Sequence, residues 1–321
     1  MIDSSTKEEV LIEALPYIQT YEGKTFVIKY GGAAMTNEQL KQTFAKDVTL
    51  LRKIGINIVI VHGGGKEITN TANALGLSTR FVNGQRYTDE PMVDVVLMVL
   101  AGKLNKGIVN LINGNGGNAV GLCGVDNSLL RARKHTPDGN DLGFVGEIVS
   151  VNVPFLNLLL NNGMMPVIAP LGVGERGEIY NINADLAASA LAMALRAEKL
   201  VYLSDIEGVL VNNRLISTLT KTEANALVRD GSIFDGMIPK VHSAFKTLDA
   251  GVNKVHIIDG RVKHSLLLEI FTDEGIGTQM IHENGIDPAT RAEGNHLSSN
   301  EKQPLAAALT SIFSDLNRTV A

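Results

Sequence analysis

Short apolar runs recur along the chain, and longer stretches with helical periodicity separate them. The runs are rich in β-branched residues and contain few polar residues, which is typical of strands buried on both faces of a parallel sheet. They cover residues 25–30, 57–62, 118–123, 165–169, 199–204 and 254–259. Helical spacing predicts helices over residues 37–54, 66–75, 89–112, 152–162, 184–196, 221–230 and 240–250. This alternation predicts an α/β fold with an open, mainly parallel central sheet and helices on both faces.

The two ends of the chain depart from this alternation. Residues 7–21 form an amphipathic helical pattern that contains Pro16, which is expected to kink the helix. This helix has two apolar stripes, one of Leu11, Leu15 and Ile18, the other of Val10, Ala14, Tyr17 and Tyr21. Both stripes could pack on their own subunit, or one could need a second subunit. Residues 282–321 read as a polar linker followed by a short docking helix of unknown target.

Composition excludes several classes of protein. The chain has 321 residues and a net charge of −5, which argues against broad nucleic-acid binding. Its apolar runs are too short for a membrane span and it begins without an apolar signal core, so we expect a cytoplasmic protein that does not enter a membrane. A single cysteine, Cys123, rules out a disulfide within the chain, and the histidines lack metal-ligand spacing.

Two of the predicted strands end in consecutive glycines and are followed by helical patterns. The first turn contains Gly31 and Gly32, and the second contains Gly63, Gly64 and Gly65. In a parallel sheet both turns fall at the carboxyl edge, where backbone N–H groups can face an anion. The simpler interpretation is that these glycines only tighten turns. A further G-x-G-x-x-G, at residues 172–177, is not followed by a long helix, so it predicts a hairpin and not a dinucleotide site.

Four charged residues are candidates for chemistry. Lys29 ends a strand that points toward the first glycine turn, although strand-end lysines often extend into solvent. Lys240 precedes a helical pattern, where solvated lysines are common. Asp185 begins a helix, so it could be an N-cap, a partner that holds two lysines, or both. Arg86 could bind a substrate carboxylate or form a surface pair with Asp89.

Six segments together resemble the N-acetylglutamate kinases of the amino-acid kinase family. They are VIKYGGAAM (27–35), VIVHGGGKEI (59–68), NGQRYTD (83–89), NINAD (181–185), LSDIEGVL (203–210) and GMIPKV (236–241). The resemblance runs from about residue 10 to residue 281, with all segments in the family's order. It implies a fold like that of the carbamate kinases and transfer of the γ-phosphate of ATP, bound with Mg²⁺, to N-acetyl-L-glutamate in arginine biosynthesis.

The resemblance also implies a role for each matching residue. An N-lobe, residues 23–196, would bind the acyl amino acid, and a C-lobe, residues 197–281, would bind MgATP. Lys29 and Lys240 would stabilise the transferring and leaving phosphates, and Asp185 would organise both lysines. The remaining positions would be Gly31, Gly32 and Gly63 at the phosphates, Gly64, Gly65, Arg86 and Asn181 at the acceptor, and Asp205, Gly208, Val209 and Leu210 at the nucleotide.

The chemistry agrees with the implied reaction. A glutamate carboxyl group has an ordinary pKa of about 4.3, so at neutral pH it is already an ionised nucleophile. The reaction then requires alignment and positive charge around the phosphoryl oxygens, and no general base. The product would be an acyl phosphate.

A C-terminal segment, residues 264–278, is similar to the arginine-site signature of the feedback-inhibited members. Those members have a kinked N-terminal helix that joins dimers into a hexamer, a trimer of dimers, and residues 1–22 resemble it. The likeness would place arginine near Tyr17, Lys199, His264, Glu269 and Gly275. The alternative is a hydrophobic C-terminal strand with incidental charges.

Some features leave alternatives open. Lys66 and Tyr87 depart from the family's usual proline and valine near the substrate. A sibling kinase for N-acetyl-aminoadipate differs by one methylene in its substrate, which discriminates weakly. A catalytically silent arginine sensor is the alternative from another class. Some arginine-sensitive relatives also bind a nitrogen-signalling protein, and the sequence does not decide that partnership.

Overall fold

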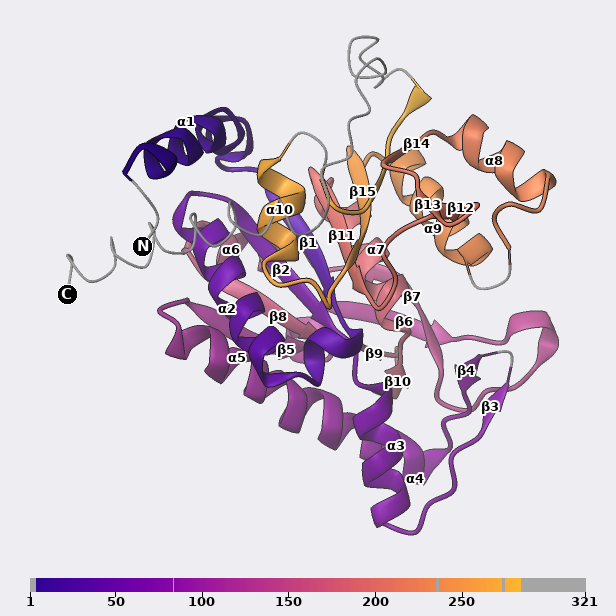
Figure 1. Ribbon diagram of the computed structural model, residues 1–321. Coiled ribbons are helices and arrows are strands. Elements are labelled where there is room, and N and C mark those ends of the chain that lie inside the picture. The colour runs from indigo at the N-terminus through magenta and orange to yellow at the C-terminus, as the bar shows by residue number, and fades with distance from the viewer. Residues whose placement is uncertain (1–3, 83, 235–236, 273–274, 284–321) are drawn as a thin grey trace.

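Parallel strands form the centre of the protein. The computed structural model describes residues 4–82, 84–234, 237–272 and 275–283, with side chains from Ile12 onward, so the predicted tail helix lies outside the described residues (Figure 1). The central sheet has the order β14-β16-β15-β11-β1-β2-β8-β5. All neighbouring strands in it run parallel except β15 and β16. Its strands are β1 (Thr25–Tyr30), β2 (Asn57–His62), β5 (Ala119–Cys123), β8 (Met165–Ala169), β11 (Lys199–Ser204), β14 (Thr218–Leu219), β15 (Lys254–Asp259) and β16 (Thr278–Met280). The predicted fold class is therefore confirmed.

Helices cover both faces because successive strand residues point in opposite directions. Phe26, Ile28 and Tyr30 of β1 pack in one apolar core, and Val27 packs in the other. The first core is covered by α1 (Ser4–Tyr21), α2 (Glu38–Lys53), α5 (Asn105–Gly114) and α10 (Ser265–Phe271). The second is covered by α6 (Val153–Asn161), α7 (Ala184–Leu195), α8 (Lys221–Arg229) and α9 (Met237–Asp249).

Several elements escaped the prediction because they are short or antiparallel. A smaller sheet, order β10-β9-β6-β7, is built from β6 (Leu130–Lys134), β7 (Gly146–Val151), β9 (Leu171–Val173) and β10 (Ile179–Asn181). Strands β9 and β10 pair antiparallel, which confirms the hairpin predicted over residues 172–177. Two further hairpins pair β3 (Phe81–Val82) with β4 (Gln85–Arg86) and β12 (Leu210–Val211) with β13 (Arg214–Leu215).

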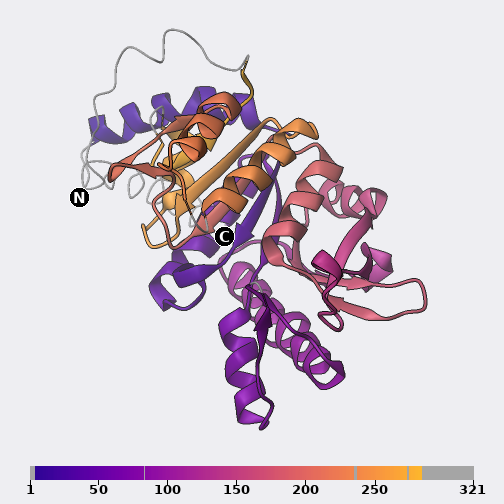
Figure 2. The ribbon, with the colours of Figure 1, turned by 90° about the vertical axis from the view of Figure 1, so that its right-hand side faces the viewer.

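The helix predicted over residues 89–112 is interrupted in its middle. It consists of α4 (Glu90–Leu97), a π-helical segment (Met98–Leu104) and α5. In the described part of the chain, Glu90–Gly114 is the one helical stretch whose length and apolarity would suffice to cross a bilayer. Its apolar residues Val95, Val96 and Ile112 are buried in the cores, as expected of a core helix in a globular domain. Together with α3 (Gly65–Ala74), α4 extends away from the sheet (Figure 2).

The N-terminal helix α1 lies across the sheet face next to α10. Ala14 and Tyr21 are buried, and the Tyr17 ring meets the Phe271 ring edge-on at 6.3 Å between centroids. On the opposite side of the helix, Ile12 and Leu15 are 63% and 50% exposed. The stripe with Ala14, Tyr17 and Tyr21 therefore packs on its own chain, whereas in the second predicted stripe Leu15 is exposed and Ile18 packs partly against the core. Residues 265–271 are helical, so the alternative of a C-terminal strand there is wrong.

Candidate functional site

The two glycine turns lie side by side at the carboxyl edge of the sheet, as predicted. Strands β1 and β2 are neighbours in parallel register, with Tyr30 opposite His62. The Gly63 N–H donates to the Tyr30 carbonyl at 2.9 Å, which ties the second turn to the first. Strand β11 borders β1 on its other side, so Ser204 and Asp205 reach the same edge.

Lys29 faces the α7 side of the sheet and meets Asp185 there. Its Nζ lies 3.0 Å from Asp185 Oδ1, with the Lys29 side chain 18% exposed and that of Asp185 37% exposed. The N-cap of α7 is Asn183, whose side chain accepts from the backbone N–H groups of Asp185 and Leu186. Asp185 is therefore not the N-cap, and its carboxylate is left to hold Lys29.

The second lysine, Lys240, lies in the first turn of α9, three residues after the helix begins at Met237. Its Nζ donates to Ser204 Oγ at 3.3 Å, at the end of β11. Because β11 borders β1, Lys29 on β1 and Lys240, which reaches the end of β11 from α9, both lie at the carboxyl edge. This arrangement can surround an anion with two positive charges.

The first glycine turn leaves no room for side chains. A Cβ on Gly31 would lie 2.6 Å from Lys29 Nζ, and one on Gly32 would collide with the Asp205 carboxylate. Gly32 also has a φ of +64°, a conformation that side chains rarely adopt. Asp205 Oδ1 accepts from the Ala33 N–H at 2.6 Å, so Asp205, which was predicted to lie at the nucleotide, is held at the first glycine turn.

Two of the other predicted nucleotide residues contact the end of the sheet. A Cβ on Gly208 would lie 2.6 Å from Thr278 Oγ1, and the Val209 N–H donates to that same hydroxyl at 2.8 Å. Leu210 is 41% exposed at the start of β12. The Gly208–Leu210 turn is thus anchored to β16 through its backbone.

Arg86 is buried beside the second glycine turn. Its Nη2 donates to the Gly65 carbonyl at 2.9 Å and to Thr69 Oγ1 at 2.8 Å. The Arg86 Nη1 atom is buried without a hydrogen-bond partner among the described residues, and burial lowers the pKa of the guanidinium. Asp89 instead caps α4, accepting from the Met92 N–H at 3.1 Å, so the alternative of a surface Arg86–Asp89 pair is wrong.

Asn181 is connected to Arg86 through Thr88, a residue that the sequence interpretation did not single out. Asn181 Nδ2 donates to Thr88 Oγ1 at 3.2 Å, and that hydroxyl donates to the Arg86 carbonyl at 3.0 Å. Of the two departures from the family pattern, Lys66 is exposed on α3 and Tyr87 lies under the Arg80 guanidinium at 4.0 Å. The Tyr87 ring is thus in contact with the Arg80 side chain.

Most of the residues expected at the effector site gather where α1, α10 and the sheet meet. The Lys199 ammonium is buried 4.7 Å above the Tyr21 ring, with no hydrogen bond or ion pair among the described residues. Burial lowers its pKa to about 8. A Cβ on Gly275 would lie 2.7 Å from Glu269 Oε2. Lys199 makes no ion pair among the described residues, and the Glu269 carboxylate is buried in the same cluster. A buried cation and a buried anion in one cluster are chemically suited to bind a zwitterion.

Glu269 is already engaged by its own chain. His256, which the sequence interpretation missed, has its Nδ1 2.6 Å from Glu269 Oε1, and the N–H groups of Ile276 and Gly277 donate to Oε2 at 2.7 and 3.0 Å. Burial raises the pKa of Glu269, but the hydrogen bonds from His256 and the Ile276 N–H hold it below its ordinary value. Glu269 therefore organises the loop after α10.

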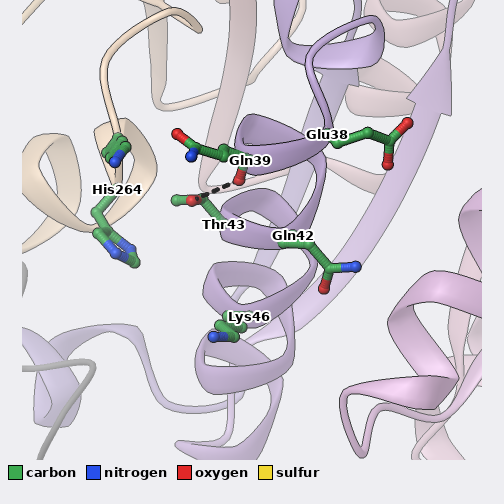
Figure 3. Close-up of a pocket in the computed structure, with 7 residues that line it drawn as sticks. Glu38, Gln39, Gln42, Thr43, Lys46 and His264 are labelled. Atoms are coloured by element: carbon green, nitrogen blue, oxygen red, sulfur yellow. Dashed lines mark hydrogen bonds between the residues drawn. The ribbon is translucent and has the colours of Figure 1, made fainter.

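His264 faces away from this cluster. It begins α10 with a φ of +58°, and its Nδ1 lies 2.7 Å from Oδ1 of the buried Asp47 on α2. A shallow hollow of about 420 Å³ lies beside it, along α2 (Figure 3). Its lining residues are Glu38, Gln39, Gln42, Thr43, Lys46, Lys263 and His264. We assign the chemistry to the strand ends, because the paired lysine, the glycine turns and the buried arginine are there.

Comparison with known proteins agrees with this geometry. The model of the Amino acid kinase family matches residues 24–259. An acetylglutamate kinase of Chlorobaculum tepidum is 58% identical over 285 residues, which are 89% of this chain and 99% of that protein. The chain belongs to the amino acid kinase family, among the acetylglutamate kinases.

Several solved structures share the fold. N-acetylglutamate synthase from Neisseria gonorrhoeae, complexed with coenzyme A and N-acetyl-glutamate, has a TM-score of 0.77 and 30% identity; the match covers 86% of this kinase and 63% of the synthase chain. A second structure of that synthase, complexed with coenzyme A and L-arginine, has a TM-score of 0.73 and 28% identity, covering 85% of this kinase and 65% of that chain. Carbamate kinase from Giardia has a TM-score of 0.56 and 19% identity, and the match covers 81% of this kinase and 99% of that chain. At this identity the likeness shows the shared fold alone.

Proposed function

We propose that this kinase transfers the γ-phosphoryl group of ATP to the side-chain carboxylate of N-acetyl-L-glutamate, forming N-acetyl-L-glutamyl 5-phosphate. The observation that carries the proposal is the Lys29–Asp185 pair at 3.0 Å, with Lys240 at the end of the neighbouring strand. Two ammonium groups at one sheet edge suit a reaction that needs neutralisation of phosphoryl charge and in-line alignment. The named relatives support the acceptor, and they do not favour the sibling substrate or the silent sensor.

In this mechanism the acceptor binds in the N-lobe, residues 23–196, and the nucleotide in the C-lobe, residues 197–281. The buried Nη1 of Arg86 can still donate to an acceptor carboxylate. Asn181 is linked to Arg86 by hydrogen bonds through the Thr88 hydroxyl. Lys29, fixed by Asp185, would stabilise the γ-phosphoryl oxygens, and Lys240 the leaving β-phosphate. Mg²⁺ bound to the ATP phosphates would neutralise further charge. The described residues contain no group of three or more His, Cys, Asp or Glu side chains that could hold a metal ion.

Trapping of the acyl phosphate with hydroxylamine tests the reaction. Purified protein with MgATP should form a hydroxamate with N-acetyl-L-glutamate, and much less with glutamate or N-acetyl-aminoadipate. Preference for N-acetyl-aminoadipate would point to the sibling kinase. No hydroxamate with any of these acceptors would contradict the proposal and favour the sensor.

We also propose that arginine inhibits this kinase by binding near Tyr17, Lys199, Glu269 and Gly275 in a hexamer assembled through α1. The buried, unpaired Lys199 ammonium suits the carboxylate of an amino acid, and the exposed apolar side chains of Ile12 and Leu15 suit a second subunit. His264 would act through α10, because it faces Asp47. Arginine should raise the melting temperature of the wild type and leave that of a Lys199→Ala variant unchanged; equal shifts in both would contradict this site.

The proposed substrates of this kinase are small anionic metabolites. We propose that it acts in the cytoplasm. The proposed inhibitor would bias one subunit arrangement over another, because a ligand acts on a distant site only through its different affinity for two states.

A further inference from the structure

A chain of buried polar groups supports the second glycine turn from behind. His62 ends β2 fully buried, with its Nδ1 2.9 Å from the Gly63 carbonyl and its Nε2 3.3 Å from Asn105 Nδ2. Asn105 is also fully buried, and its Nδ2 lies 2.8 Å from the Val167 carbonyl and 3.3 Å from that of Leu122. The network therefore connects the ends of β2, β5 and β8.

The partners of Asn105 determine the state of His62. Lys106 Nζ donates to Asn105 Oδ1 at 3.2 Å, and the carbonyl groups around Nδ2 require an amide that donates there. If the amide oxygen and nitrogen of Asn105 were exchanged, two acceptors would meet at the Val167 carbonyl and two donors would meet at Lys106. The Gly63 carbonyl at Nδ1 can only accept, so the ring proton resides on Nδ1, and Nε2, which faces the donor-only Nδ2 of Asn105, carries none. The Nδ1–H group then donates to the Gly63 carbonyl, which fixes the orientation of that peptide.

The π-helical segment brings three residues onto this turn. The Asn105 N–H donates to the Leu100 carbonyl, five residues earlier. Residues five apart lie about 140° apart around an α-helix, whereas i→i+5 bonding brings them toward one side. A Cβ on Gly64 would lie 2.5 Å from both Leu100 Cδ2 and Leu104 Cδ1. The segment thus packs against Gly64 while Asn105 holds His62.

We propose that Asn105 and His62 are positioning residues for the acceptor substrate: they fix the Gly63 peptide, and so aim the N–H groups of Gly64 and Gly65, through one obligatory tautomer. The inference rests on the proposed function, which places the acceptor at these glycines. It adds a role for two residues that do not touch substrate. It also explains the π-helical segment, because a regular α-helix would not direct Leu100, Leu104 and Asn105 toward the same glycine turn. The competing interpretation is that the network only fills the core.

Steady-state kinetics separates these two interpretations. Asn105→Asp replaces the amide donor by a carboxylate, and His62→Asn keeps a donor near the Nδ1 position while losing the contact to Asn105. We expect Asn105→Asp and Asn105→Ala to raise KM for N-acetyl-L-glutamate about tenfold with a smaller change in KM for ATP, as for loss of one well-placed hydrogen bond. His62→Asn should retain more of the acceptor affinity than His62→Ala.

A matched control lies on the same helix. Asn113 is exposed, but both ends of its amide bond the backbone of Ala119, at 3.1 and 2.6 Å, away from the glycine turn. Asn113→Ala should lower the melting temperature without separating the two KM values. Equal changes of both KM values in Asn105→Ala, or the same pattern in Asn113→Ala, would overturn the proposal.

Nitrogen-15 NMR of labelled histidines tests the network without any turnover. The wild-type His62 signal, assigned by its loss in His62→Asn, should report the Nδ1–H tautomer, and Asn105→Asp should abolish that tautomer. An Nε2–H tautomer in the wild type, or an unchanged signal in Asn105→Asp, would overturn the inference. Absence of wild-type activity on N-acetyl-L-glutamate, with the NMR result as expected, would instead reject the proposed acceptor and its positioning while leaving the network established.

Discussion

Lys29 Nζ lies 3.0 Å from Asp185 Oδ1, and this pair joins the end of β1 to the first turn of α7. The contact forms because Lys29 belongs to the strand face that packs on α7. Since Asn183 takes over capping of the helix, the Asp185 carboxylate is available to orient the ammonium. The relationship makes the charge of Lys29 part of a prearranged site.

Asp185→Asn should therefore lower kcat by about tenfold or more, because the amide removes the charge that orients Lys29. The effect on KM for either substrate should be smaller. Stopped assays at saturating substrates would measure the loss, and a thermal melt would check that the fold is retained. An unchanged kcat in a folded variant would remove Asp185 from the mechanism.

Loss of either lysine should be more severe. Lys29→Ala and Lys240→Ala should each lower kcat by at least about 100-fold, as for loss of a transition-state donor. Lys246→Ala is the matched control for Lys240, because Lys246 is exposed on the same helix α9. Near-normal turnover in a lysine variant would exclude that residue from catalysis.

Arg86→Lys should weaken acceptor binding without a comparable effect on ATP. Lysine keeps the charge but loses the planar fork whose Nη2 holds Gly65 and Thr69 and whose Nη1 is left for substrate. We expect KM for N-acetyl-L-glutamate to rise about ten- to 100-fold. Arg80→Lys, an exposed change in the same segment, provides the comparison; a similar rise there would contradict the assignment.

The buried His256 should make the protein less stable as the solution becomes acidic. Burial lowers its pKa from 6.5 to about 4, so between these values the unfolded chain binds the proton more readily than the folded chain. Stabilisation from neutral His256 is therefore complete above pH 6.5 and is lost as the pH falls toward about 4. Denaturant midpoints across this range should fall less steeply in His256→Asn, which keeps a donor for Glu269. His242→Asn, at an exposed position, is the control, and identical slopes in wild type and His256→Asn would contradict the prediction.

The exposed apolar residues of α1, Ile12 and Leu15, should determine assembly. Deletion of residues 1–22, and the single change Leu15→Glu, should dissolve the proposed hexamer, because a charge replaces a side chain that is 50% exposed in the isolated chain. Light scattering would measure the mass, and arginine inhibition should weaken in parallel. Gln19→Glu adds the same charge at another exposed position of the helix and should leave the mass unchanged. An unaltered mass after the deletion would count against assembly through α1.

The apolar pattern predicted the central sheet closely, for a physical reason. Strands such as Asn57–His62 are buried on both faces, so nearly every residue in them is apolar and their limits are visible in the chain. Strands β6 and β7 mix polar with apolar residues and have no such signal, and of the smaller sheet only the β9–β10 hairpin was visible, through its glycines. The π-helical segment was hidden as well, because its apolar spacing continues that of α4 and α5.

The sequence by itself determined the parallel core and the two glycine turns, and so the edge at which they meet, because apolar spacing and glycine act locally. Only the tertiary structure decided which charged groups become partners. Lys29 meets Asp185, Arg86 binds Gly65 and not Asp89, and His256 reaches Glu269. These contacts join segments distant in the chain, and their strength depends on burial that is established only when the strands and helices have packed.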